Sequence, residues 1–169
     1  MVNADLLAHN SQFEKKIFEH AKGIWTAVGY AASNVHMVEG KDTVTIIDTT
    51  ESTKAAENIL AEFRKLSSKP IARIIYTHSH RDHVSGASVV VGQAGGDIPI
   101  LASHKFQSDL MGLSVDRIAP DRALGMRTQA QFGIGLNSEQ RVNLGCGPGD
   151  RPMEGLGAGY LPPTQLIEG

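Results

Sequence analysis

The strand-helix-strand pattern between residues 43 and 76 constrains the fold more than any other feature of the sequence. Residues 43–47 are mostly β-branched, which is typical of a strand. Residues 52–66 are rich in helix formers, and their apolar side chains recur at helical spacing, which predicts a helix with one buried face. Residues 71–76 form a mostly apolar run, as in a buried strand. The pattern therefore predicts a sheet with a helix packed on it.

The N-terminal third is expected to extend this sheet. Residues 24–28 and 34–39, followed by a turn and residues 43–47, predict an antiparallel meander. Residues 5–22 predict an amphipathic helix that ends at Gly23, because their apolar side chains fall on one side at helical spacing: Leu6, Phe13, Ile17, Phe18 and Ala21.

Beyond residue 86 the same alternation continues. We expect a helix over residues 87–94, a short strand over residues 98–101, and a helix over residues 103–112 with Ser103 as its N-cap. Because strands alternate with helices along the chain, the predicted fold class is α/β, with a mixed sheet covered by helices.

Composition excludes several classes of function. The formal charge of -2 argues against a nucleic-acid or anionic-membrane partner, and no apolar run approaches the roughly 20 residues that span a bilayer. The single cysteine, Cys146, excludes an internal disulfide and an all-cysteine zinc site. Since the N-terminus has no secretory signal pattern, we expect a cytoplasmic protein, or a periplasmic or secreted one if an upstream leader was removed.

The run of residues 77–83 carries the chemistry. It contains an H-x-H-x-D-H pattern directly after a predicted strand, and its potential metal ligands are His78, His80, Asp82 and His83. Imidazole and carboxylate together suit Zn²⁺. Two neighbouring zinc ions lower the pKa of a bound water and stabilise charge on attacking and leaving oxygens, so the pattern indicates a hydrolase. The alternative is that these histidines merely cap a strand or lie in solvent.

This motif resembles the signature of the metallo-β-lactamase superfamily, in which an earlier strand ends in an aspartate, as residues 46–48 do here. The similarity extends to the N-terminal part of the zinc alkylsulfatases, including Gly-Ile-Trp at residues 23–25, Ser-Asn-Val at 33–35 and the glycine-rich run from residue 145 to 157. The resemblance implies the N-terminal part of an αββα sandwich.

The resemblance also implies a site and a reaction. His78 and His80 would hold one zinc ion, and Asp82 and His83 would hold the second. Asp48 would accept hydrogen bonds that orient this loop, although an aspartate at such a position is also an ordinary helix cap. The implied activity is hydrolysis of alkyl sulfate esters, typified by dodecyl sulfate, to an alcohol and sulfate by a zinc-activated water.

The resemblance implies a division of the chain as well. Residues 1–144 would form a partial metallo-β-lactamase-like domain, and residues 145–169 a Gly/Pro-rich loop or tail that leads toward a C-terminal half. The family completes its metal site with ligands from that half, which leaves open a catalytically inactive metal-binding fragment, or another hydrolase of the same fold. The expected partner is a small-molecule alkyl sulfate, with self-association into a homo-oligomer left open.

Overall fold

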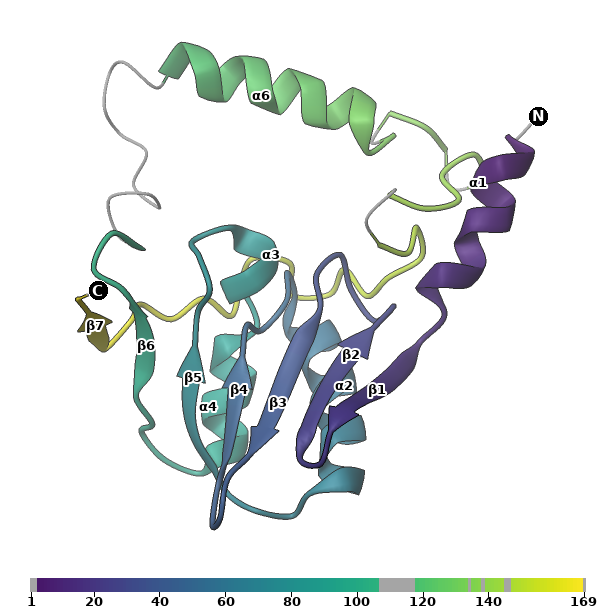
Figure 1. The fold of residues 1–169 in the computed structure, drawn as a ribbon. Coiled ribbons are helices and arrows are strands. Elements are labelled where there is room, and N and C mark those ends of the chain that lie inside the picture. The colour runs from purple at the N-terminus through teal and green to yellow at the C-terminus, as the bar shows by residue number, and fades with distance from the viewer. Residues whose placement is uncertain (1–2, 107–117, 134, 138, 145–146, 169) are drawn as a thin grey trace.

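The computed structural model describes residues 3–106, 118–133, 135–137, 139–144 and 147–168. In these residues the strands form one mixed sheet of seven strands, in the order β1-β2-β3-β4-β5-β6-β7. The first four strands pair in antiparallel fashion, and β4 to β7 pair in parallel (Figure 1). The predicted α/β class with a mixed sheet is confirmed.

The antiparallel half of the sheet differs from the sequence prediction at its first strand. The strands are β1 (Lys16–Ala21), β2 (Ile24–Val28), β3 (Val35–Glu39) and β4 (Val44–Ile47). The predicted meander is therefore confirmed, but the predicted helix over residues 5–22 is wrong. Only α1 (Ala4–His9) and the 3-10 turn η1 (Asn10–Phe13) are helical, and β1 follows them.

Pairing with β2 explains why the second part of this segment is a strand. Gly23 adopts φ 81°, which allows a tight hairpin turn between β1 and β2. Ile17 and Phe18 then lie opposite Ala27 and Thr26 in the ladder. Aromatic and β-branched residues pack well against cross-strand neighbours, so sheet pairing overrides the helical spacing of this segment.

The parallel half consists of strand-helix-strand units. Its elements are α2 (Thr53–Leu66), β5 (Ile71–Ile75), α3 (Arg81–Val84), α4 (Ala87–Ala94), β6 (Ile100–Ser103) and β7 (Gln165–Ile167). The predicted helices over residues 52–66 and 87–94 are confirmed, and Ser52 caps α2 by accepting a hydrogen bond from Ala55 N at 3.1 Å. Ser103 belongs to β6 rather than to a helix N-terminus, and residues 107–112 of the helix expected there lie outside the described residues.

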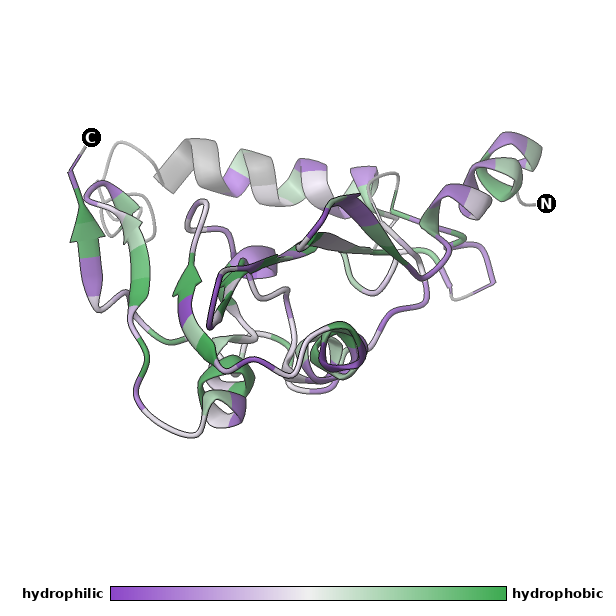
Figure 2. Ribbon diagram, turned by 60° about the horizontal axis from the view of Figure 1, so that its bottom comes forward, coloured by the Kyte–Doolittle hydropathy of each residue, from purple (hydrophilic) through white to green (hydrophobic). Residues whose placement is uncertain are grey.

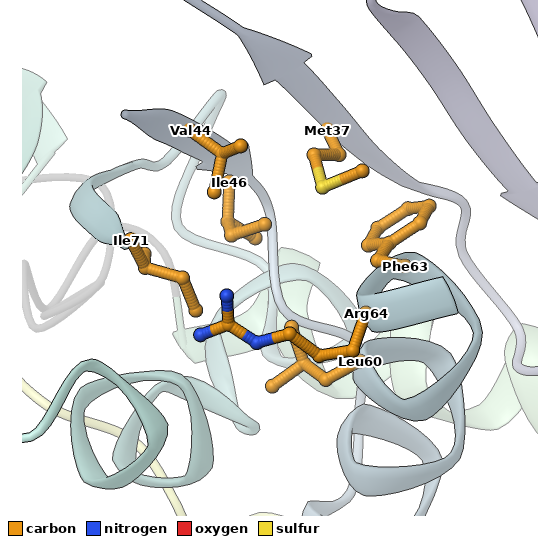
Figure 3. A pocket seen from close by; sticks show the side chains of 7 residues that line it. All are labelled: Met37, Val44, Ile46, Leu60, Phe63, Arg64 and Ile71. Carbon is orange, nitrogen blue, oxygen red and sulfur yellow. The ribbon is translucent and has the colours of Figure 1, made fainter. Parts of the chain in front are cut away.

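Helices α2 and α4 cover one face of the sheet, as Figure 2 shows. The core lies between them and the sheet, and Phe63 of α2 is among its most buried side chains. Figure 3 shows Phe63 and Leu60 facing Met37, Val44 and Ile46 of the sheet. The cavity among these side chains measures about 10 Å³, barely enough for one water, so this apolar layer is a packed core and not a binding site.

The C-terminal segment, residues 147–168, runs back across the molecule. It passes beside α3 before it reaches β7, which pairs with β6 at the edge of the sheet (Figure 1). Backbone bonds join Lys54 N to Glu154 O at 3.3 Å and Ser88 N to Gly159 O at 2.9 Å, and the Tyr76 hydroxyl donates to Leu161 O at 2.9 Å. The described part of this glycine-rich segment is therefore hydrogen-bonded to α2, to α4 and to the end of β5.

Helix α6 (Ile118–Gln131) lies apart from α2 and α4, above the strand ends near α3 (Figure 1). Among the described residues, no helix combines the length and the apolar character needed to cross a lipid bilayer.

Candidate metal centre

The candidate site lies at the carboxyl ends of β4 and β5, where α3 begins (Figure 1). Asp48 directly follows β4, and the histidine-containing loop directly follows β5. The carboxyl edge of a parallel pair is where open α/β sheets usually bind ligands. The sheet thus brings together two segments that are 29 residues apart at their closest hydrogen bond, from Thr77 to Asp48.

The backbone after β4 is strained. Asp48 adopts φ 59° and Thr50 adopts φ 68°, in the left-handed region that non-glycine residues rarely enter. Three backbone hydrogen bonds of 2.7 to 2.9 Å hold this conformation: Asp48 N to Ile75 O, Thr49 N to His83 O, and Ser85 N to Thr50 O. Strain of this kind persists only where surrounding contacts impose it, and it concentrates at functional sites.

The Asp48 carboxylate joins the two segments. It is only 2% exposed, and it accepts hydrogen bonds from Thr77 N at 2.9 Å and Thr77 Oγ1 at 2.8 Å. It also lies 2.8 Å from His83 Nδ1. A carboxylate that accepts a hydrogen bond from Nδ1–H fixes the orientation of an imidazole and makes its Nε2 the atom available as a ligand.

Three imidazoles lie next to one another. The centroid of the His78 ring is 4.6 Å from that of His80 and 4.1 Å from that of His83. Thr77 Oγ1 lies 3.0 Å from His78 Nδ1, and since the Thr77 hydroxyl proton goes to Asp48, we assign the shared proton to His78 Nδ1. In both His78 and His83, Nδ1 is therefore held by a hydrogen bond within the protein. Nε2 lies on the opposite side of each ring from that bond.

The charges of the loop are strongly coupled. Burial opposes protonation of His83, but its hydrogen bonds and charge interactions with Asp48 and Asp82 outweigh burial and raise its pKa to about 9. The His83 hydrogen bond lowers the pKa of Asp82, whose Oδ2 lies 3.4 Å from His83 Nε2. Burial, followed by the repulsion of His83 and His80, lowers the pKa of His78. Near neutral pH these pKa shifts favour a protonated His83 between two carboxylates, with a neutral His78 beside it.

The chemical types of these donor groups suit a divalent cation. It offers imidazole nitrogens and a carboxylate, with Asp48 behind one of the imidazoles in the position of a supporting hydrogen-bond acceptor. Across the residues that the structure describes, no three histidine, cysteine or carboxylate side chains converge on a common point as ligands. The assignment of His78 and His80 to one ion, and of Asp82 and His83 to a second, stays a prediction.

Sequence reasoning missed several residues that support the loop. Thr77 binds Asp48 through both its backbone and its hydroxyl. The Ser33 hydroxyl donates to the Asp82 carbonyl, and Ala32 N donates to both carboxylate oxygens of Glu51 at 3.0 Å. Glu51 in turn accepts from Arg151 Nε at 2.7 Å. Thr77 and Ser33 lie in stretches that the sequence singles out, at residues 77–83 and 33–35, and Glu51 closely follows Asp48. Their partners are too far along the chain to be inferred from these positions.

Comparison with known proteins finds a superfamily match over the part of the chain that contains the site. Residues 28–107 match the family model of the metallo-beta-lactamase superfamily, and this range contains both Asp48 and the histidine loop. This part of the chain therefore resembles a metallo-β-lactamase-type domain, and the name of that superfamily implies binding of a divalent metal ion.

Within that superfamily the chain is related to alkylsulfatases. It is 34% identical over 136 residues to a linear primary-alkylsulfatase of Pseudomonas sp., covering 78% of this chain and 25% of that protein. It is 30% identical over 156 residues to an alkyl/aryl-sulfatase of Saccharomyces cerevisiae, covering 90% of this chain and 24% of that protein. The chain thus spans about a quarter of the length of these relatives, in keeping with the predicted match to one part of them.

A solved structure shows the same fold. The stereoselective inverting sec-alkylsulfatase of Pseudomonas sp. superposes with a TM-score of 0.73 at 23% identity, over 99% of this chain and 27% of that one. Nearly the whole chain thus shares the fold of about a quarter of that structure.

Proposed function

We propose that the chain provides the metal-binding loop of a zinc-dependent alkylsulfatase, which hydrolyses alkyl sulfate esters of the dodecyl sulfate type to an alcohol and inorganic sulfate. His78 and His80 would hold one zinc ion, and Asp82 and His83 a second. Zinc, when bound, supplies a polarised water and charge stabilisation at the ester oxygens. The alkylsulfatase relatives support the reaction class.

The observation that carries this proposal is the hydrogen bonding of Asp48. Its carboxylate holds His83 Nδ1 at 2.8 Å and Thr77 at two atoms, so the side chain and the backbone of the loop are oriented before any ligand arrives. A loop whose histidines merely capped a strand would not require a buried carboxylate on a strained backbone. The contacts of Asp48 therefore favour metal binding over a purely structural role.

Asp48 and Thr77 would control the charge and the orientation of the histidine loop. Asp48 compensates the positive charge that accumulates on His83, and Thr77 keeps Asp48 from rotating. Since His83 has a pKa of about 9 without metal, it must release its proton before its Nε2 can serve as a ligand. We therefore expect uptake of zinc to release protons at neutral pH.

Sulfate release from dodecyl sulfate by the full chain with added zinc tests the proposal, together with the amount of zinc retained after gel filtration. His80→Ala should abolish retention of one zinc ion and all release. His104→Ala is the matched control. His104 is exposed, directly follows β6 along the chain and lies outside the histidine motif. Gel filtration also reports whether an active species is a homo-oligomer.

The outcomes separate the alternatives. Zinc-dependent release that is lost in His80→Ala and kept in His104→Ala supports the alkylsulfatase proposal. Zinc retained through the loop without release would instead identify a non-catalytic metal-binding module. If the wild-type chain and His80→Ala retain the same zinc, the proposed ligands are wrong.

A further inference from the structure

A second polar cavity lies on the other side of α3 from Asp48. It has a volume of about 250 Å³ and is lined by Arg81, Val84, Ser85, Gly157 and Tyr160. Arg81 and Ser85 are four residues apart, so they share one face of the short helix and its end, whereas Asp82 and His83 face Asp48 and its neighbours. Since one water takes up about 30 Å³, the cavity can hold a small ion with its hydration.

The polar side chains that line this cavity make no hydrogen bond or ion pair within the described ranges, and Arg81 is exposed. The Arg81 guanidinium makes neither an ion pair nor a hydrogen bond there, although Arg81 sits between two residues of the metal loop. Ser85 is only 1% exposed, and its backbone is fully used, by Thr50 O and by Gly159 N. Its hydroxyl makes no hydrogen bond to the described residues and is the polar group that this buried residue offers to the cavity.

Donors outnumber acceptors in this lining. The guanidinium only donates, and the hydroxyls of Ser85 and Tyr160 can donate as well. No carboxylate is among the lining residues, so the positive charge of Arg81 is uncompensated there. The forked geometry of a guanidinium matches the oxygens of a tetrahedral oxyanion.

A glycine lies opposite Arg81 in this cavity. Gly157 adopts φ 71°, and a Cβ atom built on it would lie 3.6 Å from Arg81 Nη1. A Cβ atom would thus make an ordinary van der Waals contact with the guanidinium, and the positive φ favours glycine at this position. The C-terminal segment thus approaches α3 closely while leaving the Arg81 donors accessible.

We propose that Arg81, Ser85 and Tyr160 form an oxyanion site for a sulfate-type group, separate from the histidine loop. The preference for sulfate rests on the proposed function, which would release this ion, whereas anion binding itself does not depend on it. Because the site is built on the opposite face of α3, it needs no metal ion.

Titration of the EDTA-treated full chain with sodium sulfate, followed by isothermal calorimetry and by amide chemical shifts, tests this site. We expect shifts at Arg81, Ser85 and residues 157–160. Because a charge-assisted hydrogen bond is lost, Arg81→Gln should weaken sulfate binding by about tenfold or more, and Ser85→Ala by a few-fold. Arg73→Gln is the matched control, since Arg73 is an exposed arginine on β5 that does not line the cavity.

Three results would overturn the proposal: no binding of sulfate, equal binding by wild type and Arg81→Gln, or an equal loss in Arg73→Gln, which would reveal unspecific charge attraction. Parallel titrations with phosphate and with methyl sulfate identify the source of the anion. Comparable binding of methyl sulfate would assign the site to an ester head group, and preference for free sulfate would assign it to the product. Since no metal is present, failure of dodecyl sulfate hydrolysis leaves this result unaffected.

Discussion

The two faces of α3 differ in how completely their polar groups are bonded. On one face His83 is held by Asp48 and Asp82, and the backbone of the helix is tied to Thr49 and Thr50. On the other face Arg81 and Ser85 border a cavity without partners for their side chains in the described structure. The first face is thus held by bonds within the protein, whereas the side chains of the second are left available to the anion that we propose.

Replacement of Asp48 should change the stability and the zinc affinity of the first face most strongly. Asp48→Ala removes the acceptor of Thr77 and His83 in a buried position, so we expect a loss of unfolding free energy of about 2 to 4 kcal/mol. It should also weaken zinc binding by about 10 to 100-fold, as the loss of a supporting carboxylate typically does. Urea denaturation of the metal-free chain and competition with a zinc chelator measure the two effects.

Asp48→Asn is the informative companion variant. It preserves the shape and the hydrogen bond from Thr77 but removes the charge that stabilises the His83 imidazolium. It should therefore recover part of the stability and little of the zinc affinity. Zinc binding unchanged in both variants would mean that Asp48 is only a structural residue.

The pH dependence of stability tests the charge of the same face. Because the pKa of His83 is about 9 in the folded chain and about 6.5 in an unfolded one, the protonated form stabilises the fold fully below pH 6.5. This contribution, of order 3 kcal/mol at most, is lost as the pH rises from about 6.5 through 9. Thermal melts of the metal-free chain at intervals between pH 6.5 and 10 should show the decline.

Asp48→Asn again provides the control, since it removes a main cause of the raised pKa. Its stability should change less over this pH interval than that of the wild type. Burial lowers the pKa of His36, and burial and neighbouring charge lower that of His78, so these two groups destabilise the fold only as the pH falls below about 6.5. An equally steep decline in the variant above pH 6.5 would contradict the assignment to His83.

Glu51 connects the first face to distant parts of the chain, and its removal should have an intermediate effect. Glu51→Gln weakens the bonds to Ala32 N and Arg151 and leaves the partly buried guanidinium without its counter-charge. We expect a loss of about 1 to 3 kcal/mol in urea denaturation. Glu57→Gln is the matched control, because the Glu57 pair with Lys54 is solvent-exposed and should contribute much less to stability.

The smallest effect is expected on the second face. Arg81→Gln removes no described contact, so the unfolding free energy without ligand should change by less than about 0.5 kcal/mol. With sulfate present, the wild type should gain stability that the variant does not. Thermal melts at low and high sulfate, with chloride at matched ionic strength, measure this difference; equal gains in both proteins would remove the contrast between the two faces.

Predictions from the sequence succeeded where local pattern and tertiary packing agree. The apolar side of α2 and the strands on either side of it were predicted correctly, since the same residues that favour each element also form its buried face. The prediction failed for β1, whose helical spacing was overridden by pairing with β2 across the turn at Gly23. The identity of residues 77–83 as the candidate site also follows from the sequence, because its ligands are close together along the chain.

The sequence by itself determined the alternation of strands and helices, the position of the histidine loop after β5 and the aspartate that ends β4, because these depend on neighbouring residues. Only the tertiary structure decided that Asp48 bonds Thr77 and His83, that Glu51 meets Arg151, and that residues 157–160 enclose a cavity with α3. These contacts join segments 29 to 100 residues apart, from Thr77 and Asp48 to Arg151 and Glu51. Their geometry depends on sheet register and on the path of the C-terminal segment, which local sequence patterns do not encode.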